Sequence, residues 1–520
     1  MARRKVTPSY TAAGDDQYLF VVTRDLSGGQ NNRMHPSVIP ENQADALTNI
    51  DLSTPGQRSR RPGLTLVEDI GATAITGIFG YDPQGYTANL FVTHGTKLER
   101  WLGSGSFVDV PITMTTSLPT KMVKTYKTPT GDVVLLSNGT DNVQEIVPST
   151  YAVTDLGDTN TSPPKTTVIE TYRNRVWMLK GDLLYFSDAA PSDFSAAFDR
   201  TSNAYRVPVG EERFILATRE AGLIIGGKEQ IWGLNPSVTP VATDKPEKLL
   251  GYGCAAGNTA VQVGDDYYFL SFDGVRGVKR TIQDKLQVGD SKPLSYLLKD
   301  EFDDINWDDI KKACAIYWDN KYFISLPTKG SSVNDVVWVY YPSTQAWTVI
   351  TGWSVSCWTT FKVGGAEYLY AGEATADGLV YRAWSGASDN GTAIEMTEHS
   401  RSIDFKTPVR KKVGGELKVV CKPAGDYTIS VYGQFDEGGY NLLGTLSVAR
   451  NLITFPTTFP VLFYPDAKVY KKFHLDPYGS WYTFAHKIYH NAVTTNAGDI
   501  TIYETSVATQ LEEYISEEEV

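Results

Sequence analysis

A basic cluster stands out in the segment TPGQRSRRPGL, residues 54–64, of an otherwise acidic chain. Arg58, Arg60 and Arg61 carry guanidinium groups, which bind phosphates and carboxylates through paired hydrogen bonds. Three interpretations are open: the cluster contacts DNA, it pairs with acids across a subunit interface, or it lies solvated in a loop. Pro62 fixes its own φ and Gly63 permits a tight turn, so the cluster ends at a change of chain direction.

Other residues that could do chemistry form no convincing site. His486 and His490 stand four apart in FAHKIYH, but on a strand they would lie about 13 Å apart, too far to share one metal ion. The acids of DEFDDINWDDI (Asp300 to Ile310) lack the alternating Asp/Asn pattern and the glycine of a calcium loop, which favours acids around a short helix. Walker loops, nucleophile elbows and His-Glu-x-x-His motifs are absent. The sequence therefore predicts no catalytic residue, cofactor or metal ligand, and a protein that is not an enzyme.

The composition limits the partners. The 520 residues carry a formal net charge of -12, which argues against a dedicated duplex-DNA binder but suits a wall along which DNA must slide. Cys254, Cys314, Cys357 and Cys421 are far apart, so reduced, buried thiols are expected. Neither a signal peptide nor an apolar run of about 20 residues is visible, which predicts no membrane segment. We expect a protein kept in a cytoplasm or packed into a particle assembled there.

The sequence contains a repeated β unit, which must position the arginines, histidines and acids described above. Seven apolar runs are each followed by a Gly, Asn or Asp turn and a second aromatic-rich run, and they begin at Ala88, Asp132, Asn174, Gly222, Asp266, Asn320 and Ala366. Further strand candidates lie between these hairpins. A spacing of about 45 residues with four strands per unit is typical of a β-propeller blade. The sequence predicts an all-β chain with a propeller of six or seven blades and one short inserted helix within SKPLSYLLKDEFDDIN.

The repeat divides the chain. We expect an N-terminal arm and extension over residues 1–65, the propeller over 66–387, a C-terminal β-sandwich-like domain over 388–510, and an acidic tail over 511–520. The arm contains one short helix candidate, ENQADALTN (residues 41–49). So long an arm before the first blade either closes the ring or reaches a neighbouring subunit.

Several segments, in order, resemble a known family. The arm ends in an element of the Gly-x-x-x-Arg-Pro-Gly type, here with one more residue before the arginine, at Gly56 through Gly63. The segment VIETYRNRVWMLKGDLLYFSDAAPSDF (Val168 to Phe194) ends in an SDxxPxDF pattern. The likeness continues through Leu216 to Asn235 and Gly251 to Val278. These features resemble the tail hub or nozzle proteins of short-tailed bacteriophages, also called tail tubular or packaged-DNA stabilisation proteins. The resemblance covers roughly residues 25–385, and the C-terminal domain matches less clearly.

The resemblance implies a structural virion protein of the phage tail, assembled in the host cytoplasm. It implies a homo-oligomeric ring, a hexamer in this family, below the portal and adaptor rings. Such a ring extends the DNA channel, helps to retain the packaged genome until ejection, and docks tail fibre or needle proteins. With this role, Arg58, Arg60 and Arg61 are predicted to be assembly or interface residues that anchor the arm to acids.

A second hypothesis comes from the abundance of Trp and Tyr, which stack on sugars as readily as they pack between blades. It predicts a carbohydrate-binding or glycan-degrading propeller that serves as an adsorption protein. A ring with a central hole in electron micrographs favours the first hypothesis, and binding or cleavage of a glycan favours the second.

Overall fold

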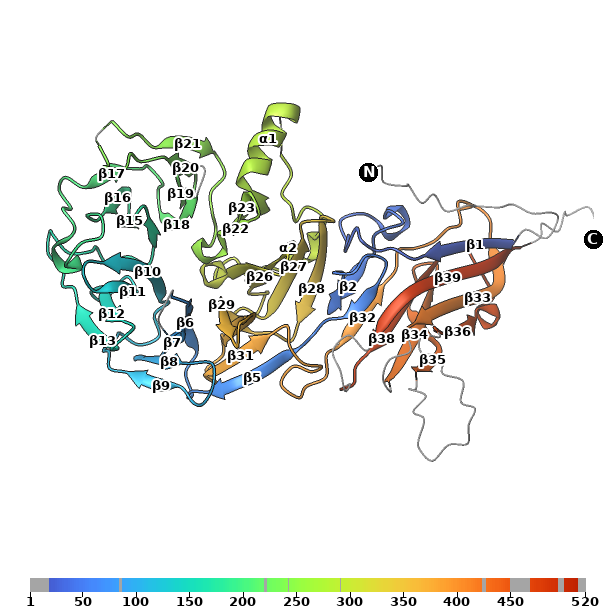
Figure 1. Ribbon diagram of the computed structural model, residues 1–520. Coiled ribbons are helices and arrows are strands. Elements are labelled where there is room, and N and C mark those ends of the chain that lie inside the picture. Colours follow the sequence, from blue (N-terminus) through green and yellow to red (C-terminus); the bar gives the residue numbers. More distant parts are fainter. Residues whose placement is uncertain are drawn as a thin grey trace, which may run out of the picture.

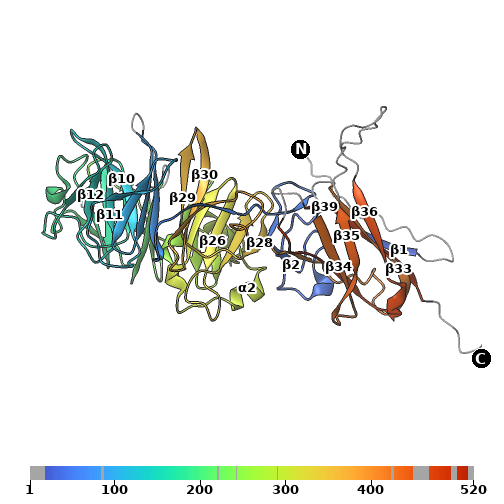
Figure 2. The same ribbon diagram turned by 90° about the horizontal axis from the view of Figure 1, so that it is seen from below.

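The computed structural model shows a propeller joined to a second β domain (Figure 1). It describes residues 18–83, 87–218, 222–241, 243–289, 291–422, 427–448, 468–493 and 500–512. Most of the predicted acidic tail lies outside the described residues. Viewed from below, the molecule is elongated, with the propeller at one end and the second domain at the other (Figure 2).

Seven sheets follow one another around the propeller axis in the described part of the chain: six have four strands and one has three. Three four-stranded sheets come first: β6 (Ile75–Tyr81), β7 (Asn89–His94), β8 (Lys97–Trp101) and β9 (Val108–Val110); β10 (Lys121–Lys127), β11 (Gly131–Ser137), β12 (Gln144–Val147) and β13 (Ala152–Asp155); β14 (Ile169–Tyr172), β15 (Arg175–Lys180), β16 (Leu183–Phe186) and β17 (Ala204–Arg206). The next are β18 (Glu212–Thr218), β19 (Gly222–Gly227), β20 (Ile231–Leu234) and β21 (Glu247–Leu250), then the three-stranded sheet β22 (Val261–Val263), β23 (Asp266–Ser271) and β24 (Gly274–Gly277). The last two contain β25 (Cys314–Trp318), β26 (Lys321–Leu326), β27 (Val336–Tyr341) and β28 (Ala346–Thr351), and β29 (Val355–Val363), β30 (Ala366–Glu373), β31 (Leu379–Ala383) and β5 (Leu64–Asp69).

The prediction of a β-propeller with six or seven blades is confirmed. Each of the seven predicted hairpins forms the second and third strands of one sheet. The second strand of each of these sheets is mostly apolar and buried, because sheets on both sides cover both of its faces. All six residues of β7, β26 and β27 are buried. Each blade is therefore recognisable in the sequence as an apolar run that ends in a turn.

The ring is closed by the N-terminal arm. Strand β5 pairs antiparallel with β31 and supplies the fourth strand of the last blade. The last strand of the ring thus comes from the segment that precedes the first blade, one of the two outcomes expected for the arm.

Helices are few and lie in the connections around the three-stranded sheet. Helix α1 (Val278–Val288) follows β24 and projects from the propeller (Figure 1). It ends at Gly289, whose φ of 80° is left-handed and suits glycine. Helix α2 (Lys299–Asp303) is the predicted short helix within SKPLSYLLKDEFDDIN. Single 3₁₀ turns are η1 (Pro36–Val38), η2 (Phe194–Ala196), η3 (Gly257–Thr259), η4 (Ile310–Lys312) and η5 (Asp476–Tyr478).

The second domain is a sandwich of two sheets, which confirms the predicted sandwich-like domain. One sheet contains β1 (Tyr18–Thr23), β3 (Ile50–Asp51), β4 (Arg58–Arg60), β39 (Thr501–Leu511), β33 (Lys412–Cys421), β36 (Val469–His474) and β37 (Ser480–Trp481). The other contains β2 (Ala46–Thr48), β32 (Met396–His399), β38 (Phe484–His490), β34 (Tyr427–Phe435) and β35 (Tyr440–Val448). Four strands from the arm therefore take part in a domain otherwise built from the C-terminal part of the chain.

Strand β2 joins the two domains. It pairs in parallel with β28 of the propeller and antiparallel with β32 of the sandwich, so nine strands form one continuous sheet. One hydrophobic core runs across the same junction, from Val337 and Trp358 in the propeller to Leu417 and Ile488 in the sandwich. The predicted helix at residues 41–49 is wrong: Ala46–Thr48 is a strand, because pairing on both sides and burial of Leu47 outweigh its helical propensity.

Candidate functional site

The arginine cluster lies inside the sandwich rather than on a surface. Arg58, Arg60 and Arg61 expose 1%, 0% and 0% of their surface. Arg58 and Arg60 alternate with Ser59 on β4 and therefore share one face of that strand, which points into the domain. Burial of so much charge is costly unless opposite charges or hydrogen bonds compensate it.

Arg58 is compensated by an acid on the facing sheet. Its Nε lies 2.8 Å from Oε2 of Glu398 on β32, and both side chains are 1% exposed. His486 on β38 approaches the other oxygen of this carboxylate, with Nε2 3.7 Å from Oε1. Burial alone would raise the pKa of Glu398, but Arg58 and His486 outweigh it and lower this pKa below its usual value. The group is thus an ionised carboxylate held between two cationic or polar partners.

Arg61 is held from several directions. Its Nη1 and Nη2 donate to the two carboxylate oxygens of Asp389 at 2.9 and 2.7 Å, and its Nε donates to Oδ1 of Asn49 at 2.7 Å. The guanidinium also lies over the ring of Trp353, 4.5 Å from its centroid. Carbonyl oxygens of Pro62 and Thr351 accept the remaining hydrogen bonds. This forked geometry ties the end of the arm to the segment that follows the last blade.

The three interpretations of the cluster can now be compared. Arg58 and Arg61 pair with acids of the same chain, and all three side chains are buried in it. Arg60 lies close enough to His490 for its charge to disfavour protonation of that histidine. Any effect of these arginines on assembly acts through the position of the arm, since buried side chains do not touch a neighbouring subunit or DNA. Their predicted role in assembly stays a prediction.

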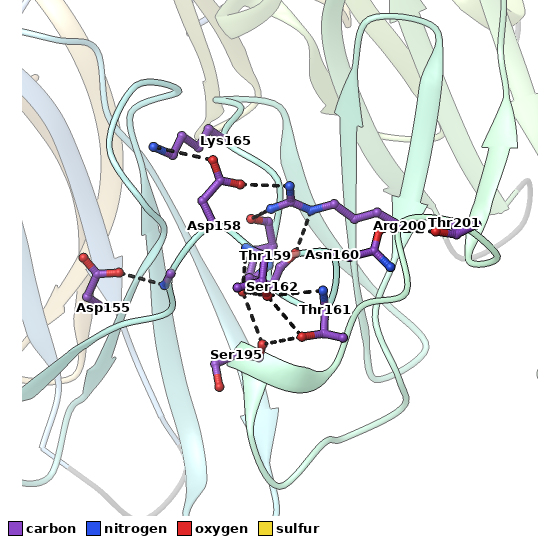
Figure 3. A network of polar contacts seen from close by, with 12 residues as sticks. Asp155, Asp158, Thr159, Asn160, Thr161, Ser162, Lys165, Ser195, Arg200 and Thr201 are labelled. Carbon is purple, nitrogen blue, oxygen red and sulfur yellow. Dashed lines mark hydrogen bonds and ion pairs between the residues drawn. The ribbon is translucent and has the colours of Figure 1, made fainter.

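A second polar network locks a connection between two blades (Figure 3). Arg200 Nε and Nη2 donate to the carbonyl oxygens of Ser162 and Pro163 at 2.9 and 2.6 Å. Its Nη1 lies 2.8 Å from Asp158, and this contact is the main cause of the lowered pKa of that carboxyl. Ser162 also donates to the carbonyl of Ser195. The network fixes the path of the chain after β13 against Ser195 and Arg200, which follow the SDAAPSDF segment.

The histidines and cysteines of the sequence form no metal centre in the part of the chain that the structure describes. His486 and His490 lie on strand β38, as expected, and both are buried. All four cysteines are free; Cys254, Cys314 and Cys421 are buried and Cys357 is half-buried. Burial raises the pKa of Cys254, Cys357 and Cys421 to about 12, so these thiols are protonated at neutral pH.

Two adjoining hollows in the propeller lie at the end of its sheets where the first strands of several blades begin. A cavity of about 410 Å³ lies among the starts of β6, β25 and β29. A second, of about 290 Å³, adjoins it beside the starts of β14 and β18. We call the two together the axial mouth; they share Pro119, Thr120, Lys121, Asn258 and Lys311. A concave site of this size with a few polar groups is the kind that binds small molecules.

Charges at the axial mouth are partly paired. Nη1 of Arg213 lies 2.7 Å and Nζ of Lys311 lies 2.8 Å from Oε1 of Glu211. These two hydrogen-bonded cations lower the pKa of Glu211 to about 2. Lys311 directly precedes β25 and Glu211 directly precedes β18, so this ion pair links the two blades that come before and after the three-stranded sheet in the chain. This site was not predicted from the sequence. The only feature that could indicate it is the position of Lys121, Asn258 and Lys311, each of which lies at the first strand of a blade or in the turn before it.

The fold and these sites define an all-β protein built on a propeller with an attached sandwich. No family model matches the sequence, and no curated protein matches it. The part of the chain that the structure describes has no helix long and apolar enough to cross a membrane.

Solved structures give only a general likeness. One is BBS1N in complex with ARL6DN, with 11% identity and a TM-score of 0.40, covering 63% of this chain and 99% of that chain. YCF48 bound to D1 peptide has 8% identity and a TM-score of 0.39, covering 62% and 99%. The extracellular domain of the putative hybrid two-component system BT4673 from B. thetaiotaomicron has 8% identity and a TM-score of 0.42. The match covers 62% of this chain and 39% of the BT4673 chain. These values carry no argument about function.

Proposed function

We propose that this protein is a structural subunit of a bacteriophage tail, a nozzle or hub that forms a ring around the DNA channel. The proposal begins from the ordered resemblance of residues 25–385 to that family. Its segments overlap structural units: Val168 to Phe194 contains β14–β16, and Leu216 to Asn235 contains β19 and β20 with the end of β18. The element at Gly56 through Gly63 contains Arg58 and Arg61, whose ion pairs with Glu398 and Asp389 hold the arm.

One observation carries the proposal: the two domains are joined as a single elongated body. The nine-stranded sheet and the common hydrophobic core cross the junction, and Arg61 ties the arm to Asp389 beside it. A ring subunit that bears load during DNA ejection needs such a junction, because a flexible linker would let the domains turn separately. The role is assembly and gating and requires no catalysis.

The partners follow from the proposed role. Subunits pack into a ring, with six as the expected number, between the portal and adaptor rings and the tail fibre or needle proteins. The genome passes through transiently. A net charge of -12 supports this passage, because acidic walls repel DNA phosphate and let it slide without being held. The protein would be assembled in the host cytoplasm and found in the tail of the virion.

Electron microscopy of the purified full chain, with mass measured by light scattering, tests the proposal. We expect a ring with a central hole and no retardation of linear DNA at 0.15 M salt. A monomer at all concentrations, together with labelling of the protein away from the tail axis of virions, would contradict it. The Arg60→Ala/Arg61→Ala double variant is expected to impair the ring, whereas a variant at the exposed Arg206, R206A, is the matched control.

A further inference from the structure

The axial mouth is a second feature, independent of the ring. Its larger cavity is lined by Lys121, Lys311 and Lys312, and by no aspartate or glutamate of the described residues. The adjoining cavity adds Arg213 but also Glu211 and Glu212, so the mouth as a whole carries charges of both signs. A cation without an acidic partner is therefore needed to attract an anion to the larger cavity.

The three lysines are not equivalent. Lys311 is paired with Glu211 at 2.8 Å, and Lys312 is paired with Asp309 at 2.7 Å. Lys121 is exposed at the start of β10. Its ammonium has no hydrogen bond or ion pair among the described residues, although its charge partly offsets the effect of burial, which raises the pKa of Glu170. One ammonium group is thus available at the edge that the two cavities share, which matches a ligand with one negative charge.

Uncharged polar groups surround this ammonium. Asn258 on η3 is exposed into both cavities. Asn334 also lines the larger cavity and is 1% exposed; its Nδ2 donates to the carbonyl oxygens of Lys312 and Val355 at 2.9 and 2.7 Å. Its Oδ1 has no hydrogen-bond donor. A buried acceptor without a donor costs free energy, which a ligand hydroxyl would recover.

From these groups we propose that the axial mouth binds a hydroxylated carboxylate, namely a uronic acid unit of an acidic glycan. The carboxylate pairs with Lys121. Ring hydroxyls, which both donate and accept, satisfy Asn334 Oδ1 and the amide of Asn258. The apolar lining of Ile75, Ile78 and Trp358 takes the carbon face of the sugar ring. Binding without cleavage is proposed, so no bond is made or broken.

Calorimetric titration of the full chain with sodium glucuronate, glucose and inorganic phosphate tests this inference. Glucose has the same ring hydroxyls without the carboxylate, and phosphate has the charge without the ring. We expect glucuronate to bind at least tenfold more tightly than either. Raising the salt from 0.05 to 0.5 M should weaken glucuronate binding, because Lys121 is solvent-exposed and its charge is screened.

Two variants locate the site. Lys121→Met should weaken glucuronate binding about fivefold or more, within the range of one charge-assisted hydrogen bond, and Asn258→Ala should weaken it by a smaller factor. Lys97→Met, at an exposed lysine of β8 outside the mouth, should leave it unchanged. An unchanged melting temperature in each variant excludes misfolding as the cause.

Three outcomes would overturn the inference: no glucuronate binding, equal affinity for glucuronate and phosphate, or glucuronate binding that K121M leaves intact. None of them bears on the ring, because the ring is measured separately by microscopy. The two proposals therefore fail or stand independently.

Discussion

Arg58 and Glu398 face each other across the core of the sandwich, with Nε 2.8 Å from Oε2, although the whole propeller lies between them in the chain. A buried ion pair of this kind adds little net stability, because desolvation of both groups offsets their attraction. Removing one partner is costly, since the other is then left buried and charged. We infer that the pair specifies one alignment of β4 against β32, and so one path for the arm.

Replacement of Arg61 should destabilise the protein strongly. Arg61→Ala removes the cation from Asp389, which among the described residues keeps only the indole N–H of Trp353 as a donor, and it takes one of two donors from Oδ1 of Asn49. Loss of one partner of a buried pair typically costs about 3–5 kcal/mol. Arg61→Lys keeps the charge but not the fork, so it should cost less. Differential scanning calorimetry measures both, with R206A as the exposed control. An R61A protein that melts like the wild type would show that Arg61 does not hold the arm.

A single methyl group at residue 63 should also loosen the arm. A Cβ on Gly63 would lie 1.9 Å from the carbonyl oxygen of Ser388, so one of the two backbones must move. We expect Gly63→Ala to cost about 1–3 kcal/mol, as overpacking usually does, and to expose the arm to limited proteolysis. At Gly439 a Cβ would meet no atom within 4 Å, so Gly439→Ala is the control. Equal protease resistance of the two variants would count against this close contact.

Acidification should weaken the fold before the carboxylates titrate. Burial, with positive charge from Lys487 and His486, lowers the pKa of His399 to about 4 from its ordinary value near 6.5. The unfolded chain binds this proton between pH 6.5 and 4 and the folded chain does not. The stability is therefore complete above pH 6.5 and is lost as the pH falls towards 4.

The measurement is the melting temperature from pH 7.5 to 4 for the wild type and His399→Gln. The variant should have a flatter profile in that window, while part of the slope remains because burial also lowers the pKa of His490. His474→Gln, at an exposed histidine, should change nothing. Identical slopes for H399Q and the wild type would contradict the assignment to His399.

The thiols should be unreactive in the native protein. Burial raises the pKa of Cys254, Cys357 and Cys421 to about 12 and that of Cys314 further, so almost no thiolate is present at pH 8. Mass spectrometry after iodoacetamide treatment should find four modified thiols in denaturant and far fewer in buffer. Cys357, which is half-buried and lines the axial mouth, should react first. Rapid modification of Cys254 in the native state would be inconsistent with this order.

The propeller could be predicted from the sequence because burial on both faces gives the second strand of each blade a mostly apolar run. The hairpin beginning at Asp266 still showed this run although its sheet lacks a fourth strand. Helix α1 was not predicted because few of its residues are apolar. Val278 and Ile282 pack against a core cluster, but Leu286 is 83% exposed, so the apolar face is short.

The arm could not be predicted in the same way. Strands β2, β3 and β4 contain two or three residues each, too few to show a period. The partners of β2 lie near residues 349 and 398, and β4, which pairs with β3, has its other partner near residue 501. Long-range pairing decides such short strands. The arginines were found from composition, but Glu398 and Asp389 as their partners were not, since nothing local to either acid marks it.

The position of β5 sets an order of events during synthesis. A ribosome releases the arm first, yet β5 has no partner until β31 has been made. Strands β3 and β4 can pair with each other at once, whereas β2 must await β28 and β1 must await β39. Strands β1, β2 and β5 therefore stay unpaired through the translation of most of the propeller. A chain that ends before β31 cannot close the propeller, and one that ends before β39 lacks the strand that joins β1 to β33. Completion of each domain thus depends on an early and a late segment of the polypeptide.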